Sequence, residues 1–101
     1  MIVVVDYGMG NLRSVQKAFE RLGLSALITN ELDKIGNATK IILPGVGHFA
    51  RGMQNLNESG ITDVLKKEIL INKKPILGIC LGMQLLTGFS EEGNIDGLGF
   101  I

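Results

Sequence analysis

Four short runs of largely apolar residues constrain the fold of this chain more than any other feature of its sequence. They cover residues 1–5, 25–29, 40–43 and 75–79. The first run is rich in β-branched residues and has no polar face, which is typical of a strand buried on both sides, as in a parallel sheet. We therefore predict a strand over each of the four runs.

Amphipathic segments separate these runs. Apolar residues recur every three or four positions over residues 12–22, and Gly23 follows as a stop signal. Residues 49–56 and 61–69 show the same spacing, which predicts two helices or one helix broken at Gly60. Strands that alternate with such helices form β-α-β units with parallel strands and right-handed crossovers.

This alternation predicts an α/β fold: a doubly wound, mostly parallel sheet with helices on both faces, of the flavodoxin-like kind. A chain of 101 residues holds at most one such domain. Residues 97–101 look like the beginning of another strand, and no helix follows them. We therefore expect a truncated domain that leaves some apolar surface uncovered.

Charge and composition exclude several classes of function. Ten Lys and Arg residues balance ten Asp and Glu residues, which argues against binding to nucleic acid or to an anionic membrane. No apolar run approaches the roughly 20 residues that cross a bilayer, and the first residues do not resemble a signal peptide. The single Cys cannot form an internal disulfide, so we expect a cytoplasmic protein.

That cysteine lies where the fourth strand gives way to a helix predicted over residues 81–87. The sequence from Gly78 to Gly82 has the form Gly-x-Cys-x-Gly, a nucleophile elbow with Cys80 in place of serine. A turn this tight leaves no room for side chains two residues before and after the nucleophile. The start of the helix favours a thiolate, and the Leu81 N–H is a candidate oxyanion donor. A lone cysteine is more often inert core, but its flanking glycines favour a nucleophile.

A second glycine-rich segment follows the third strand, at Pro44-Gly45-Val46-Gly47. In a parallel sheet it emerges at the same edge as the elbow, so an N–H of Val46 or Gly47 is positioned to complete an oxyanion hole with Leu81. The simpler alternative is a tight strand-to-helix turn. The segment also fits a loose dinucleotide-binding pattern, but the acidic residues about 20 positions further on, Asp63 and Glu68, fall in a helical pattern and not at the end of a strand.

His48 is the only histidine of the chain, so any Cys–His pair within it must use this residue. Its alternatives are a general base, a turn residue, a position at a helix N-terminus, or a residue that supports the site without touching the substrate. One histidine and one cysteine are too few ligands for zinc. We expect neither a metal nor a cofactor.

Three segments carry a resemblance to a known family: residues 78–86, residues 44–49 and residues 6–12. Together they resemble class I, triad-type, glutamine amidotransferases, and among these the glutaminase subunits of imidazole glycerol phosphate synthase, over essentially the whole chain. The resemblance implies that Cys80 attacks the carboxamide of glutamine and forms a glutamyl thioester. Ammonia then leaves, and water releases glutamate.

The same resemblance implies a heterodimer with a (β/α)8-barrel cyclase, which uses the ammonia in histidine biosynthesis. It implies that Gly45 and Gln84 contact glutamine, that Asn11 lies near the interface where ammonia is transferred, and that His48 supports the site from behind. It also implies that the segment of residues 44–47 supplies its oxyanion donor only after a backbone rearrangement triggered by the partner.

The chain departs from the family in length. Family members are about twice as long, and the His and Glu that complete the triad belong to their C-terminal half. Residues 1–101 are thus expected to form the N-terminal part of a single amidotransferase domain and to be inactive alone. The alternatives are a non-catalytic docking module of the same fold, a paralogue that serves surface-sugar amidation, and a peptidase or deglycase relative with a Cys elbow.

Overall fold

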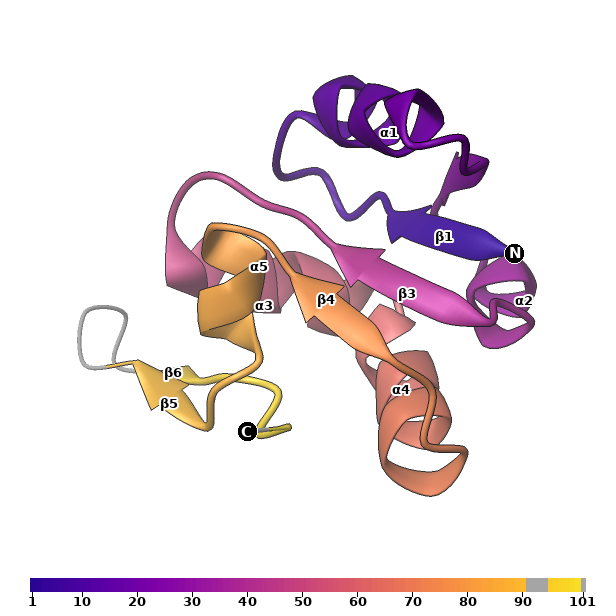
Figure 1. Cartoon of the computed structure of the whole chain (residues 1–101). Helices are drawn as coiled ribbons and strands as arrows, with labels where there is room; N and C mark the ends of the chain where they lie inside the picture. The colour runs from indigo at the N-terminus through magenta and orange to yellow at the C-terminus, as the bar shows by residue number, and fades with distance from the viewer. Residues whose placement is uncertain (91–94, 101) are drawn as a thin grey trace.

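A computed structural model describes residues 1–90 and 95–100 and contains a four-stranded parallel sheet in the order β2-β1-β3-β4 (Figure 1). The strands are β1 (Ile2–Val5), β2 (Ala26–Thr29), β3 (Lys40–Leu43) and β4 (Ile76–Gly78). All four lie within the runs predicted from the sequence. The parallel α/β architecture predicted from the alternation of strands and helices is therefore confirmed.

Helices lie on both faces of the sheet, as the doubly wound fold requires (Figure 1). Helix α1 (Leu12–Arg21) connects β1 to β2 on one face. The other face carries α2 (Leu32–Gly36), α3 (Phe49–Glu58) and α4 (Ile61–Lys66). The predicted break at Gly60 separates α3 from α4, because this glycine adopts a left-handed conformation with φ of 81°.

The core lies between the sheet and helices α2, α3 and α4. One row of strand residues, in register across β1, β3 and β4, faces it: Val3, Ile41 and Ile76. Helical side chains that are fully buried fill the space opposite this row: Ile35, Leu56, Ile61 and Leu65. This is the well-packed face of the domain.

The face covered by α1 is less complete. Its row runs from Val4 through Ile42 to Leu77, and their exposed fractions rise from 0% to 5% and then to 52% at the edge strand. No residue of α1 is fully buried, although its apolar side chains face the sheet. An open apolar groove of about 350 Å³ lies between α1 and Ile79. The uncovered apolar surface expected of a truncated domain is thus present beside β4.

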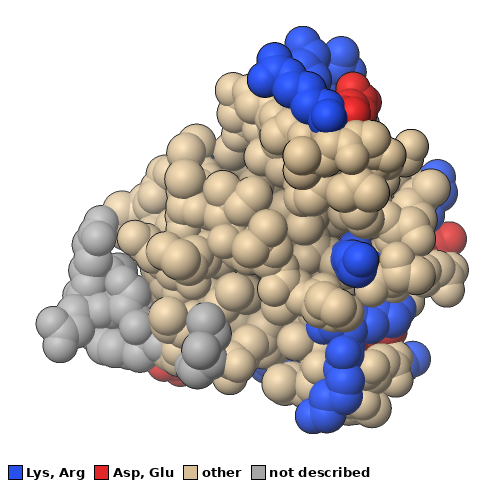
Figure 2. Space-filling model, in the orientation of Figure 1, with Lys and Arg blue, Asp and Glu red and all other residues tan. Residues whose placement is uncertain are grey.

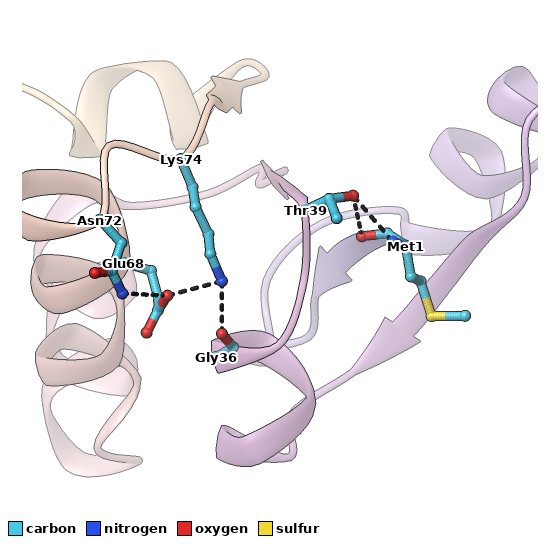
Figure 3. Close-up of polar contacts among 6 residues, drawn as sticks. All are labelled: Met1, Gly36, Thr39, Glu68, Asn72 and Lys74. Atoms are coloured by element: carbon cyan, nitrogen blue, oxygen red, sulfur yellow. Dashed lines mark hydrogen bonds and ion pairs between the residues drawn. The ribbon is translucent and has the colours of Figure 1, made fainter.

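Polar side chains join the loops at the amino ends of the strands (Figure 3). The α-ammonium group of Met1 donates to Thr39 Oγ1 at 2.9 Å, and the Thr39 N–H donates to the Met1 carbonyl at 2.9 Å. Lys74 Nζ lies 2.7 Å from Glu68 Oε1 and also donates to the Gly36 carbonyl at 2.6 Å. These contacts fasten the start of β1 to β3 and the start of β4 to α2.

The carboxylate of this cluster is buried, and one of its oxygens, Oε1, has two partners. Glu68 lies in a π-helix (Lys67–Ile71) that continues α4, and Asn72 Nδ2 donates to its Oε1 at 2.9 Å. The hydrogen bond from Lys74, and after it the one from Asn72, hold the pKa of Glu68 below its ordinary value. The sequence predicted neither α2 nor this π-helical turn.

The end of the described chain differs from the prediction. Strands β5 (Phe89–Ser90) and β6 (Ile95–Asp96) form a short antiparallel pair. Residues 97–100 are not the start of a strand, and Ile101 lies outside the described residues. Instead, the N–H groups of Leu98 and Phe100 donate to the carbonyls of Leu85 and Leu86 at 2.8 Å. The free carbonyls at the end of a helix accept these N–H groups in place of strand partners.

Candidate active site

The predicted site residues come together at the carboxyl ends of the strands. The loop of residues 6–11 follows β1, the segment of residues 44–48 follows β3, and Ile79 and Cys80 follow β4 (Figure 1). Because β3 is paired with both β1 and β4, the three loops are neighbours. Open parallel sheets bind their ligands at this edge. We refer to residues 44–47 below as the PGVG loop.

Cys80 occupies a strained turn between β4 and α5 (Leu81–Leu85). Its φ of 53° and ψ of −119° lie outside both the right-handed and the left-handed helical regions, and the side chain is exposed. A non-glycine residue in such a conformation costs on the order of 1–3 kcal/mol and persists only where its surroundings enforce it. The thiol therefore projects from the sheet edge into solvent.

The two glycines beside Cys80 are required by packing, as the sequence predicted. A Cβ on Gly78 would lie 2.6 Å from Met83 Cα, and a Cβ on Gly82 would overlap the carbonyl oxygen of Leu43. The Ile79 N–H also donates to the Leu43 carbonyl at 3.0 Å. The elbow is thus pressed against the end of β3, and no side chain fits between them.

The PGVG loop contacts the elbow directly. The Leu81 N–H donates to the carbonyl oxygen of Gly45 at 2.9 Å. The predicted oxyanion donor is therefore occupied by a protein acceptor in this conformation. The peptide between Gly45 and Val46 is trans, so its N–H points away from its carbonyl oxygen and hence away from Leu81. Val46 and Gly47 are exposed, and Gly47 has a φ of 123°.

His48 lies immediately after the PGVG loop and begins helix α3. Its Nδ1 accepts a hydrogen bond from the Ala50 N–H at 3.2 Å, and the ring is exposed. Among the alternatives raised by the sequence, this geometry is that of a residue at a helix N-terminus. An Nδ1 that accepts from the backbone is not free to accept a proton from a thiol.

Asn11 precedes the PGVG loop in the sequence, and Gln84 follows it. Asn11 Oδ1 accepts from the Ser14 N–H at 3.4 Å and caps α1. Gln84 is exposed on α5, one turn after Cys80. Gly10, beside Asn11, packs so closely on the loop that a Cβ there would lie 2.9 Å from Gly45 Cα. The first loop, the PGVG loop and α5 thus form one contiguous surface.

Sequence reasoning assigned no role to Tyr7, which lies beneath this surface and contacts the PGVG loop. The ring is buried, and the phenol Oη donates to the Pro44 carbonyl oxygen at 2.5 Å. Burial raises the pKa of the Tyr7 phenol well above its ordinary value, so it remains a donor at neutral pH. The available signal was a tyrosine two residues after a buried strand, because a buried phenol needs a polar partner.

Charged side chains are unevenly distributed over this face of the molecule. Figure 2 shows Lys and Arg side chains over α1, around α4 and at one place between these groups, whereas the area toward α5 is largely uncharged. Within residues 1–90 and 95–100, no group of three or more potential metal ligands occurs. In the same part of the chain, no helix is long and apolar enough to span a membrane.

Comparisons with known proteins show the family to which the chain belongs. Residues 3–93 match the family model described as glutamine amidotransferase class-I. The chain is 54% identical over its whole length to imidazole glycerol phosphate synthase subunit HisH 2 of Methanococcus maripaludis, and covers 50% of that protein. It is 50% identical, with the same coverage, to the HisH 2 subunit of Pseudomonas aeruginosa.

A solved structure titled as a glutamine amidotransferase superposes with a TM-score of 0.77 at 25% identity. The alignment covers 98% of this chain and 52% of that chain. The chain thus spans about half the length of the curated relatives and of the solved structure that it matches.

Proposed function

Because the chain belongs to the class I glutamine amidotransferase family, we propose that its protein is the glutaminase subunit of an imidazole glycerol phosphate synthase. One observation carries the proposal: an exposed Cys80 on a strained strand-to-helix turn, framed by Gly78 and Gly82. The names of the relatives supply the expected substrate and pathway. The cytoplasm, where histidine biosynthesis is expected, is the proposed location.

In the proposed reaction, Cys80 Sγ attacks the carboxamide carbon of glutamine. The tetrahedral intermediate collapses to a γ-glutamyl thioester, and the nitrogen leaves as ammonia after it has gained a proton. Water then attacks the thioester, which releases glutamate and regenerates the thiol. The net change is glutamine plus water to glutamate plus ammonia. Gln84 and Gly45 are the proposed contacts of the glutamine side chain.

The oxyanion that forms in both steps needs hydrogen-bond donors, and in the observed conformation these N–H groups are not available to it. The Leu81 N–H is bound to Gly45, while the Val46 N–H points away from it. Rotation of the single peptide between Gly45 and Val46 removes the carbonyl from Leu81 and turns the Val46 N–H toward the same position. One backbone movement thus releases one donor and supplies a second, with Gly47 next to it. We propose that docking of the partner drives this rotation.

The proposed partner is a (β/α)8-barrel cyclase subunit that receives the ammonia. Asn11 and the PGVG loop lie on the same edge of the sheet as Cys80, where such a partner would close over the site. His48 supports the loop by capping α3 rather than by acting as the base. The base and its orienting carboxylate are proposed to be a His and a Glu outside residues 1–101. We propose no cofactor or metal.

We further propose that residues 1–101 are the N-terminal part of one amidotransferase domain. The relatives are about twice as long, and β4 is an edge strand of the described sheet with an exposed Leu77. An uncovered apolar strand of this kind needs further chain beside it. Because the proposed base also lies outside these residues, we expect the 101 residues alone to hydrolyse glutamine at a negligible rate.

The test measures glutamate release by the protein as its gene encodes it, with and without the cyclase subunit. We expect activity that depends on the cyclase and that falls at least about 10³-fold in Cys80→Ser. Residues 1–101 alone serve as a control, because they lack the proposed His that acts as the base. A protein that binds the cyclase but releases no glutamate would instead be a non-catalytic docking module. Ammonia transfer to a sugar acceptor would assign the surface-sugar paralogue.

A further inference from the structure

Tyr7 is the most deeply buried polar side chain at the carboxyl end of the sheet, and no step of the proposed reaction uses it. Its exposed fraction is 5%, and its Oη donates to the Pro44 carbonyl oxygen at 2.5 Å. Pro44 itself is fully buried. A buried carbonyl of this kind has no access to water, so loss of the phenol would leave it unpaired.

The phenol also fills the space beside the next residue. A Cβ on Gly45 would collide with Tyr7 Oη and would lie 3.3 Å from Tyr7 Cζ. On its other sides, Gly45 is confined by the backbone of Gly10 and by Leu81 Cβ, at 3.2 Å from the same Cβ position. The Cα of Gly45 is therefore held in place, whereas the peptide after it leads into exposed Val46.

Tyr7 is itself fixed from the opposite side. Asn55 Nδ2, on helix α3, donates to the Tyr7 carbonyl oxygen at 3.0 Å. The same amide group occupies the space above Gly8, where a Cβ would lie 3.2 Å from it. The backbone of Tyr7 is thus tied to α3 and its phenol to the PGVG loop, so the residue links the two.

We propose that Tyr7 is a positioning residue for the oxyanion hole: its phenol fixes the Pro44 carbonyl, so that only the peptide between Gly45 and Val46 rotates. This inference rests on the proposed glutaminase function and deepens it. With Pro44 and Gly45 Cα fixed, the rotation delivers the Val46 N–H to one defined position. Without the phenol, the PGVG loop moves as a whole, and the Val46 N–H no longer forms a linear hydrogen bond to the oxyanion.

The inference predicts an effect on the transition state and not on substrate binding. In Tyr7→Phe the ring remains and only the phenol hydroxyl is lost. We expect kcat for glutamine hydrolysis by the cyclase complex to fall about 10- to 100-fold, since small misplacement of a catalytic group costs up to about 10²-fold. KM for glutamine stays within about twofold of the wild-type value, because the donor acts on the oxyanion.

The experiment compares four forms of the protein as its gene encodes it, each in complex with the cyclase. They are the wild type, Tyr7→Phe, Asn55→Ala, which removes the tie to α3, and the control Gln54→Ala, an exposed neighbour on the same helix. We expect a smaller loss of kcat in Asn55→Ala than in Tyr7→Phe, with KM unchanged, and none in Gln54→Ala. Alkylation of Cys80 by iodoacetamide, which needs no oxyanion hole, proceeds at the wild-type rate in all four.

Three results would overturn the inference. The first is a kcat in Tyr7→Phe within twofold of the wild type. The second is a loss that appears equally in kcat, KM and Cys80 alkylation, which would indicate a disordered elbow. The third is a wild-type complex without glutaminase activity, which would remove the proposed function and the inference with it. The first two results leave the proposed function intact, so the two failures are distinguishable.

Discussion

At the amino ends of the strands, charged and polar side chains join the loops, whereas at the carboxyl ends glycine backbone packs on neighbouring backbone beside the buried phenol of Tyr7. Glu68, Asn72 and Lys74 form one closed cluster at the first end (Figure 3). At the other end, the Leu81 N–H meets the Gly45 carbonyl, and Gly82 lies against Leu43. The fold thus joins the first end through an ion pair, and the second through close glycine contacts that the Tyr7 phenol supports.

The difference follows from what each end does. The ion pair restrains the loops that carry it, because Glu68 is buried and would lose its cation if either loop moved. Glycine backbone, by contrast, changes its conformation at small cost, and Gly8, Gly10 and Gly47 at the carboxyl end already have positive φ. The glycine-rich end is therefore the one that suits the peptide rotation proposed above.

The largest effect on stability is expected at the carboxyl end, where the backbone of Gly82 lies against the backbone of Leu43 and leaves no space for a side chain. In Gly82→Ala the new Cβ overlaps the Leu43 carbonyl oxygen, which is backbone and cannot move aside. We expect a loss of more than about 3 kcal/mol in the free energy of unfolding, measured by urea denaturation of the natural protein.

Gly88→Ala is the matched control for that substitution. No atom lies within 4 Å of a Cβ at Gly88, and its φ is not positive. We expect a change of less than about 0.5 kcal/mol in the free energy of unfolding. Equal losses in the two variants would show that the elbow yields to a side chain and that the backbone contact is not tight.

A smaller loss of stability is expected at the amino end. Lys74→Met removes the cation that lies between Glu68 and Gly36, and leaves a buried carboxylate with Asn72 as its remaining partner. Because a buried charge without its partner is unfavourable, urea denaturation should show a lower midpoint than in the wild type. Lys66→Met, an exposed lysine of α4, should leave the midpoint unchanged. A midpoint lowered equally in both variants would contradict the role of the ion pair.

The same cluster makes stability depend on pH. The pKa of Glu68 is lower in the folded chain than its ordinary value, so the folded state favours the carboxylate. The stabilisation is complete above about pH 5.5 and is lost as the pH falls through the ordinary pKa of about 4.3 toward the folded value. Thermal unfolding between pH 6 and pH 3 measures it. In Lys74→Met this slope should be shallower, and an unchanged slope would assign it to other carboxylates.

Much of the fold could be predicted because its strands are short apolar runs with no alternative use. Residues 40–43 form β3 with the predicted bounds, and Gly60 divides two helices as expected. Helix α2 escaped prediction because Leu32–Gly36 is only five residues long, too short to show a helical period. The strand expected over residues 97–101 was wrong for the described residues 97–100, since the free carbonyls at the end of α5 accept hydrogen bonds from the N–H groups of Leu98 and Phe100.

Some features of the site could be predicted from the sequence, and others could not. The sequence predicted that Gly78 and Gly82 are needed, although only Gly78 is excluded by the turn itself, whereas a side chain at Gly82 is excluded by Leu43 at the end of β3. The contacts of Tyr7 with Pro44 and of Leu81 with Gly45 join residues more than 30 positions apart. Such contacts depend on the order of strands in the sheet, which a single sequence does not specify. The role of Tyr7 therefore emerged only with the structure.

The smallest expected effect sharpens the comparison between the two ends, since each contains one non-glycine residue with positive φ. These are Cys80 at the carboxyl end, with φ of 53°, and Lys73 before β4 at the amino end, with φ of 59°. Glycine adopts this region without the steric cost of a Cβ, although it loses more backbone entropy on folding. We expect Cys80→Gly to raise the free energy of unfolding by about 1 kcal/mol and Lys73→Gly by less, both measured by urea denaturation.

The two variants differ in what the gain in stability does to function. Cys80→Gly should abolish glutamate release by the cyclase complex, whereas Lys73→Gly should leave it at the wild-type rate. The strain at the amino end is then a by-product of a tight turn, while the strain at the carboxyl end is retained because it projects a thiol toward the substrate. A Cys80→Gly variant that is less stable than the wild type would mean that the side chain, rather than the surrounding packing, holds the elbow in shape.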